Sequence, residues 1–170
     1  TKIEKEYGNI DEWVTKELGY DSIEDMHNAL AAEQVDSVAM AIYQMKHGQG
    51  MIIGDQTGVG KGRQMAALIR WACRQGKKPV FITQKADLFS DIYRDLVDIG
   101  SGELRPFIFN SDGAMVDNNG YVVHKPLSAA TQAKVFAGHE LPTGYDFAVL
   151  TYSQVNTGDQ VSQEEAKEAA

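Results

Sequence analysis

Apolar residues recur at intervals of three and four along much of the chain, and short uninterrupted apolar runs separate several of these stretches. The first pattern is typical of amphipathic helices, whereas the second is typical of strands that are buried on both faces. Because strands and helices alternate from residue 51 onward, a parallel sheet is the favoured architecture and the expected fold class is α/β. Helices are predicted over residues 10–18, 22–30, 33–46, 64–74, 86–97 and 128–137, and strands over 51–54, 78–83, 105–109 and 146–152.

The composition of the chain changes twice along its length. Residues 1–31 are polar and acidic with two short helical patterns, so they are predicted to form a helical N-terminal appendage. Residues 32–157 carry the alternating pattern and are predicted to form the main domain. Residues 158–170 end in QEEAKEAA and are predicted to be a polar acidic tail. The chain begins at Thr1 without an initiator Met, which indicates a fragment or a processed product.

The charge balance and the cysteine count exclude several classes of protein. Sixteen Lys and Arg against 24 Asp and Glu give a net charge of −8, which argues against a protein that coats phosphate backbones. The single Cys73 excludes an internal disulfide framework, and the four histidines show no metal-ligand spacing, so no metal site built from them is expected. No apolar run is long enough to span a membrane, and the first residues lack the apolar core of a signal peptide. An intracellular protein without a membrane partner is therefore expected.

A glycine-rich segment, residues 54–63, follows a predicted strand and precedes a predicted helix. Glycines at 58 and 60 allow successive backbone N–H groups to point at phosphate oxygens, and Lys61 can reach the outer phosphates. This pattern predicts a nucleoside triphosphate site; the alternative is a glycine-rich turn with a solvated lysine. The candidate nucleotide-binding residues are Asp55, Gln56, Thr57, Gly58, Val59, Gly60, Lys61, Gly62 and Arg63, with Lys61 also the candidate catalytic residue.

The segment departs from the usual phosphate-loop pattern G-x-x-x-x-G-K-[ST] at two positions. Asp55 stands where the first glycine is expected, and Gly62 replaces the hydroxyl residue that normally binds magnesium, so the metal is expected to be held less directly. Asp55 either braces the turn through its carboxylate or is an ordinary turn residue. Arg63 either contacts a phosphate or a carboxylate, or lies in solvent on the first turn of the helix.

Both departures occur together in the run GDQTGVGKGRQMAALI, which resembles the strawberry notch family of superfamily 2 helicase-like ATPases, including its bacterial and phage relatives. The similarity extends from about Leu30 to Tyr152. It implies that residues 32–157 are part of the first lobe of a RecA-like P-loop NTPase with three layers. It also implies a location in the cytoplasm of a bacterial or phage-infected cell.

The resemblance implies roles for residues outside the glycine-rich segment. Gln34 is similar to the glutamine that reads the adenine edge in these helicases, because an amide offers both a donor and an acceptor; the alternative is a polar residue facing solvent. Two segments that follow predicted strands are similar to motifs near the nucleic-acid path. The alternatives there are a polar loop for the first segment and a core tyrosine for the second. The candidate nucleic-acid residues are Thr83, Gln84, Lys85, Thr151 and Tyr152.

The implied function is ATP binding with Mg²⁺ in a motor that moves along or remodels nucleic acid, with DNA as the expected polymer. Hydrolysis in this superfamily requires an acidic pair at the end of a strand, and no apolar strand candidate here ends in Asp-Glu. We therefore expect this chain to bind nucleotide but to hydrolyse it poorly, with most Mg²⁺ ligands and the second RecA-like lobe elsewhere in the parent protein. The alternatives are a small P-loop kinase, which would require a Ser or Thr hydroxyl at residue 62, and a non-catalytic interaction module.

Overall fold

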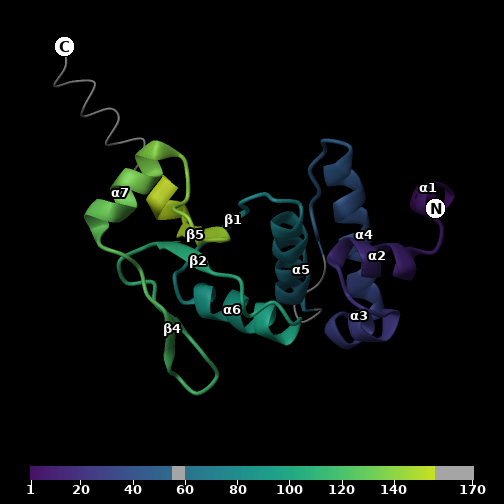
Figure 1. Ribbon diagram of the computed structural model, residues 1–170, viewed down its shortest axis with the longest axis horizontal. Coiled ribbons are helices and arrows are strands. Elements are labelled where there is room, and N and C mark those ends of the chain that lie inside the picture. Colours follow the sequence, from purple (N-terminus) through teal and green to yellow (C-terminus); the bar gives the residue numbers. More distant parts are fainter. Residues whose placement is uncertain (55–59, 156–170) are drawn as a thin grey trace, which may run out of the picture. The chain divides into compact units, whose positions relative to one another are not determined.

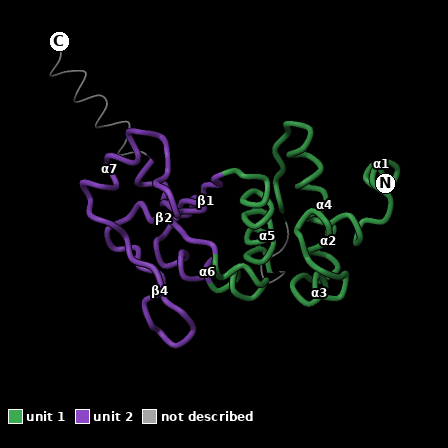
Figure 2. The backbone as a smooth tube through the Cα atoms, viewed as in Figure 1, with its two compact units in different colours: residues 1–77, 94–103 green, residues 78–93, 104–170 purple. Residues whose placement is uncertain are grey.

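The computed structural model describes residues 1–54 and 60–155 (Figure 1). The chain divides into two compact units, which Figure 2 distinguishes by colour. The first unit combines Thr1–Lys77 with Arg94–Glu103, and the second combines Lys78–Tyr93 with the chain from Leu104 onward. The predicted boundary between residues 31 and 32 is not one of these division points, and it stays a prediction.

The first unit is built from helices, and capping side chains mark the beginnings of the first three. The side chain of Asn9 accepts from the backbone N–H of Glu12, and that of Ser22 accepts from the backbone N–H of Asp25. Such caps satisfy N–H groups that have no partner inside a helix. The helices of this unit are α1 (Lys2–Tyr7), α2 (Ile10–Leu18), α3 (Ile23–Ala29), α4 (Ala32–Lys46) and α5 (Lys61–Arg74).

Polar contacts accompany the apolar core of the first unit. The indole Nε1 of Trp71 donates to Oε2 of Glu17 at 2.8 Å, and Lys46 pairs with the other carboxylate oxygen of Glu17. Trp71 and Trp13 are both buried, so both indole rings pack in the interior of this unit. The core includes the fully buried side chains of Leu18, Met26, Leu30 and Ile42.

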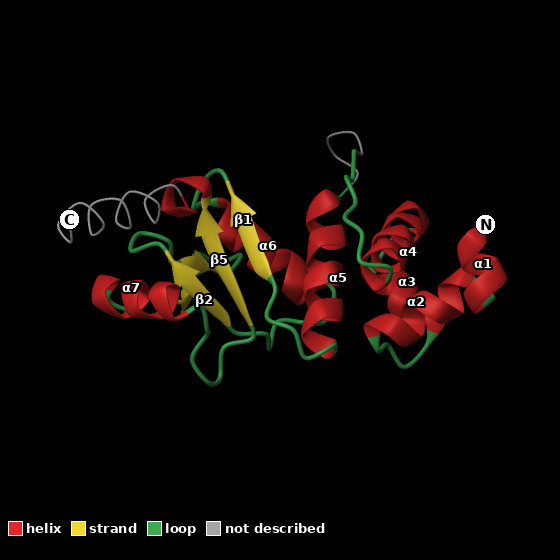
Figure 3. Cartoon of the chain, turned by 90° about the horizontal axis from the view of Figure 1, so that it is seen from above, coloured by secondary structure: helices red, strands yellow, loops and turns green. Residues whose placement is uncertain are grey.

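The second unit contains a parallel sheet in which the last strand lies in the middle (Figure 3). Its strands are β1 (Val80–Thr83), β2 (Pro106–Phe109) and β5 (Phe147–Thr151), in the order β1-β5-β2. Both pairings are parallel, and Ala148 of β5 lies opposite Val80 of β1 and Phe107 of β2. All five residues of β5 are buried, as its apolar composition predicts. The predicted parallel sheet is confirmed.

The remaining helices and strands lie outside this sheet. Helix α6 (Leu88–Asp98) contributes residues to both units, and helix α7 (Ala129–Gly138) belongs to the second. Strands β3 (Met115–Val116) and β4 (Val122–His124) form a separate antiparallel pair in a region for which no strand pairing is predicted from the sequence. No helix in the described part of the chain is both long enough and apolar enough to cross a bilayer.

One strand prediction is wrong. Residues 51–54 have no regular secondary structure, and the side chain of Ile52 is 94% exposed. Among the described residues, no strand pairs with this segment. A short apolar run adopts a strand conformation only when a neighbouring strand satisfies its N–H and C=O groups, and here that neighbour is absent from the described sheet.

Candidate nucleotide site

Gly60 is the N-cap residue of α5 and has a left-handed backbone conformation, with φ at 72° and ψ at 42°. Its carbonyl accepts from the backbone N–H of Arg63 at 3.1 Å, which closes the first turn of the helix. Lys61 follows as the first helical residue and is exposed. The segment therefore ends at the positive end of the α5 dipole, where an anion is stabilised. The candidate residues Asp55, Gln56, Thr57, Gly58 and Val59 lie outside the described residues.

Gln34, in the first turn of α4, contacts the end of this segment. Its Oε1 accepts from the backbone N–H of Ala31 at 2.9 Å, and its Nε2 donates to the carbonyl oxygen of Gly60 at 3.2 Å. The side chain is only 6% exposed, so the alternative of a glutamine facing solvent is wrong. A Cβ atom on Gly60 would overlap with Nε2 of Gln34. The structure thus brings together two residues that the sequence singled out separately, both within the first unit.

Gly62 lies against the carboxylate of Asp95, a residue of α6 that also belongs to the first unit. A Cβ atom on Gly62 would overlap with Oδ2 of Asp95 and would lie 2.8 Å from its Cγ. The carboxylate therefore occupies the space in which a side chain at position 62 would begin. Sequence reasoning missed Asp95, because no motif surrounds it. The one signal in the sequence was the missing hydroxyl at residue 62, because a magnesium ion there would require an oxygen ligand from another residue.

Arg63 is held by groups of the protein. Its Nη1 donates to the carbonyl oxygen of Ala29 at 3.2 Å, and its Nη2 pairs with Oδ2 of Asp98 at 3.3 Å. These contacts connect the first turn of α5 to the end of α3 and to α6. A contact between Arg63 and a phosphate stays a prediction.

The candidate nucleic-acid residues gather at one end of the sheet in the second unit. Thr83 and Thr151 are the last residues of β1 and β5 and lie opposite each other in the parallel register. Both threonines are buried, whereas the residues that follow them, Gln84, Lys85 and Tyr152, are exposed. Tyr152 is 60% exposed, so the alternative of a core tyrosine is wrong. Ligands of open α/β sheets bind at the carboxyl ends of parallel strands, which is where these residues lie.

A known protein family matches more than half of the chain. The model of a family described as P-loop containing NTP hydrolase pore-1 matches residues 11–119. The chain belongs to this family. The match begins before the stretch from Leu30 on which the resemblance was based, and within the predicted appendage.

A curated relative is protein strawberry notch of Drosophila melanogaster, to which the chain is 36% identical over 88 residues. The aligned stretch covers 48% of this chain and 5% of that protein, so the chain spans only a small part of its length. No solved structure matches. These findings confirm the strawberry notch resemblance, and together with the parallel sheet they confirm the α/β class of a RecA-like P-loop lobe.

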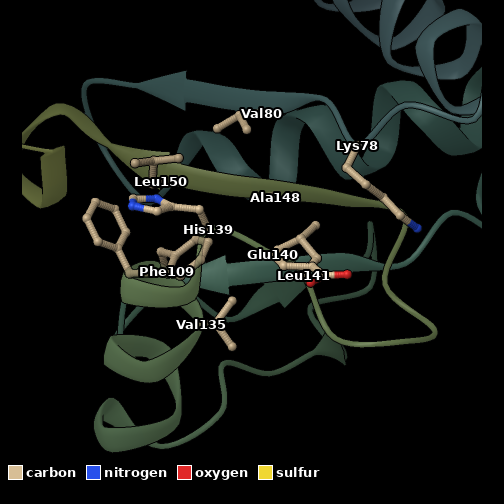
Figure 4. Close-up of a pocket in the computed structure, with 10 residues that line it drawn as sticks. Lys78, Val80, Phe109, Val135, His139, Glu140, Leu141, Ala148 and Leu150 are labelled. Carbon is tan, nitrogen blue, oxygen red and sulfur yellow. The ribbon is translucent and has the colours of Figure 1, made fainter.

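A separate hollow of about 400 Å³ lies in the second unit, where α7 faces the sheet (Figure 4). Its lining is mainly apolar and comes from all three parallel strands and from α7, with Lys78, His139 and Glu140 as the charged or titratable members. None of its lining residues is a candidate nucleotide or nucleic-acid residue. A triphosphate requires several N–H or cationic donors, so this lining does not suit one.

The described residues contain no cluster of three or more His, Cys, Asp or Glu side chains arranged to hold a metal ion. The carboxylate of Asp95 is nevertheless an oxygen donor of the type that Mg²⁺ prefers, and it lies beside the first turn of α5. The site thus fits a magnesium ion that is held mainly by the nucleotide and by few protein groups.

Proposed function

We propose that this chain is the ATP-binding part of the first motor lobe of a helicase-like ATPase that acts on nucleic acid. The observation that carries the proposal is the hydrogen bond from Gln34 to Gly60, directly before Lys61, in a chain that belongs to a family of P-loop NTP hydrolases. This contact joins a candidate adenine-reading amide to the end of a candidate phosphate loop.

The proposed roles follow from the chemistry of each group. The ammonium of Lys61 binds the outer phosphates, and the N–H groups at the start of α5 bind phosphate oxygens. The amide of Gln34 is of the type that N6 and N7 of adenine require, and adenine bound there would share or replace the contacts of this amide with Ala31 and Gly60. A bound Mg²⁺ neutralises part of the phosphate charge.

The proposal assigns hydrolysis and movement to the parent protein. No apolar strand candidate in the sequence ends in an Asp-Glu pair, which would hold the metal and position water. We therefore propose that this chain binds nucleotide and hydrolyses it poorly, and that a second lobe completes the site. Nucleic acid, with DNA as the expected polymer, contacts the sheet end formed by Thr83 and Thr151, with Tyr152 as a stacking residue.

The direct test is equilibrium binding of a fluorescent ATP analogue to the chain, with and without Mg²⁺. We expect Lys61→Ala to weaken binding about 10- to 100-fold, because a charge-assisted hydrogen bond to phosphate is lost. Lys77→Ala is the matched control, because Lys77 is an exposed lysine just after α5 and is not a candidate site residue. Equal affinities for the chain and for Lys61→Ala would contradict the proposal.

Absence of binding to the unmodified chain at millimolar nucleotide would favour the interaction-module alternative instead. The small-kinase alternative has lost its support, because the family match is to NTP hydrolases and residue 62 carries no hydroxyl.

A further inference from the structure

The carboxylate of Asp95 lies beside Gly62, the residue that follows the lysine of the candidate phosphate loop. In the usual motif, the residue after the lysine is Ser or Thr, and its hydroxyl oxygen binds the magnesium of the nucleotide. Here that residue has no side chain, and Oδ2 of Asp95 lies close enough to overlap with a Cβ atom built on it. A hydroxyl oxygen on residue 62 would be one bond from that Cβ. An oxygen from another helix therefore occupies the neighbourhood of the missing hydroxyl.

We propose that Asp95 supplies the protein oxygen for the nucleotide-bound magnesium that Gly62 cannot supply. This inference rests on the proposed nucleotide site. Asp and Glu carboxylates are common protein ligands of Mg²⁺, which is usually held by one or two carboxylates together with substrate phosphates. The glycine at 62 is then part of the same arrangement, because a side chain there would displace the carboxylate.

A carboxylate in this place makes nucleotide binding depend on the metal. Without Mg²⁺, the negative charges of Asp95 and the triphosphate repel each other. With Mg²⁺ between them, the same carboxylate attracts the complex. A neutral hydroxyl, as in the usual motif, produces no such repulsion, so the effect of the metal is larger here than in a site that uses Ser or Thr.

A nearby aspartate on the same helix provides a control. Asp98 lies one turn further along α6, and its Oδ2 pairs with Arg63 rather than lying beside Gly62. Its charge is therefore partly balanced. Asp98→Asn removes one negative charge from α6 and leaves the carboxylate beside Gly62 in place.

The experiment measures the dissociation constant of the fluorescent ATP analogue in Mg²⁺ and in EDTA for the chain, Asp95→Asn and Asp98→Asn. We expect Asp95→Asn to bind about 10- to 100-fold more weakly in Mg²⁺ and more tightly in EDTA. The dissociation constant in EDTA divided by that in Mg²⁺ therefore falls. Asp98→Asn should keep the ratio. A contact that only stabilises the packing of α5 and α6 would change the melting temperature and leave the ratio unchanged, and this result would overturn the inference.

A second pair of variants tests the same point if Asp95→Asn does not fold. Asp95→Ala combined with Gly62→Ser restores the usual hydroxyl and removes the carboxylate, so we expect metal-dependent binding to return relative to Asp95→Ala alone. Failure of this rescue would also overturn the inference. Binding that depends on Lys61 but shows the same metal ratio in Asp95→Asn would reject the role of Asp95 and leave the proposed nucleotide site intact.

Discussion

The side-chain amide of Gln34 donates a hydrogen bond to the carbonyl oxygen of Gly60 across 26 residues of sequence. The same amide accepts from the backbone N–H of Ala31 at the start of α4. One buried side chain therefore fixes the end of the glycine-rich segment relative to α4. Close approach of the two groups requires that residue 60 have no side chain.

Gly60→Ala is predicted to lower both stability and nucleotide affinity. An alanine in the left-handed conformation costs about 1–2 kcal/mol, and the added Cβ also displaces the amide of Gln34, at a cost of about 1 kcal/mol for the lost hydrogen bond. Gly48→Ala is the matched control, because Gly48 has a φ of 70° but no atom within 4 Å of the position that an alanine methyl group would occupy. Urea unfolding measures the free energy of unfolding of both variants. Equal decreases would show that the contact with Gln34 contributes nothing to stability.

Arg70→Lys is predicted to destabilise the first unit by roughly 2 kcal/mol, because a lysine cannot reproduce the planar set of donors. The guanidinium donates to the carbonyl oxygen of Leu18 at 2.7 Å and to Oγ of Ser101 at 2.8 Å. It also lies 4.2 Å from the ring centroid of Tyr20. Arg74→Lys, on the exposed end of α5, should change the urea midpoint much less. A similar shift for both variants would contradict the prediction.

Tyr152→Ala is predicted to weaken binding of a single-stranded DNA oligonucleotide to the chain by about 1–3 kcal/mol, the usual contribution of one stacked base. Tyr121→Ala is the control, because Tyr121 is 72% exposed and precedes β4, which belongs to a different sheet from β1 and β5. Fluorescence anisotropy at low salt measures the affinities. If only Tyr121→Ala weakened binding, the assigned path at the sheet end would be wrong.

Stability is predicted to fall in mildly acidic solution in part because of His124. Burial, and secondarily the positive charge of Arg105, lowers the pKa of His124 below its ordinary value of 6.5. The unfolded chain therefore binds a proton at His124 more readily than the folded chain does. The stabilising contribution is complete above pH 6.5 and decreases as the pH falls through the lowered pKa.

The measurement for His124 is the free energy of unfolding from pH 5 to pH 8, compared between the chain and His124→Gln. We expect the free energy of unfolding of the variant to decrease less below pH 6.5 than that of the unmodified chain. His47→Gln, which changes an exposed histidine, should retain the full decrease. An identical pH profile for the chain and His124→Gln would refute the prediction.

Periodicity alone predicted most of the regular structure. The helix expected at 10–18 is α2, and the expected strand at 146–152 contains β5, because both have apolar patterns long enough to decide between helix and strand. The prediction of a strand at residues 51–54 was wrong for a physical reason. Three apolar residues in sequence do not determine a strand without a partner to pair with, and strand order is a property of the whole sheet.

The candidate site was predictable only where residue type and local spacing carry the chemistry. Gly60 and Lys61 follow from the glycine-rich segment, and Gln34 followed only from the family resemblance. Asp95 could not be predicted, because its place beside Gly62 depends on how α6 lies against α5. A contact between residues on different helices leaves no spacing signal in one sequence.

The strand order β1-β5-β2 determines when the sheet can form during synthesis. Among residues 1–54 and 60–155, strands β1 and β2 pair with no strand of this sheet other than β5, although β5 is the last of the three to be made. Until residues 147–151 have left the ribosome, the two earlier strands have exposed edges and lack the neighbour with which the described sheet pairs them. The helices of the first unit form from nearer contacts and can fold earlier. The nascent chain therefore passes through a stage in which the apolar strands β1 and β2 must be kept from pairing with other chains, and this stage ends only when β5 inserts between them.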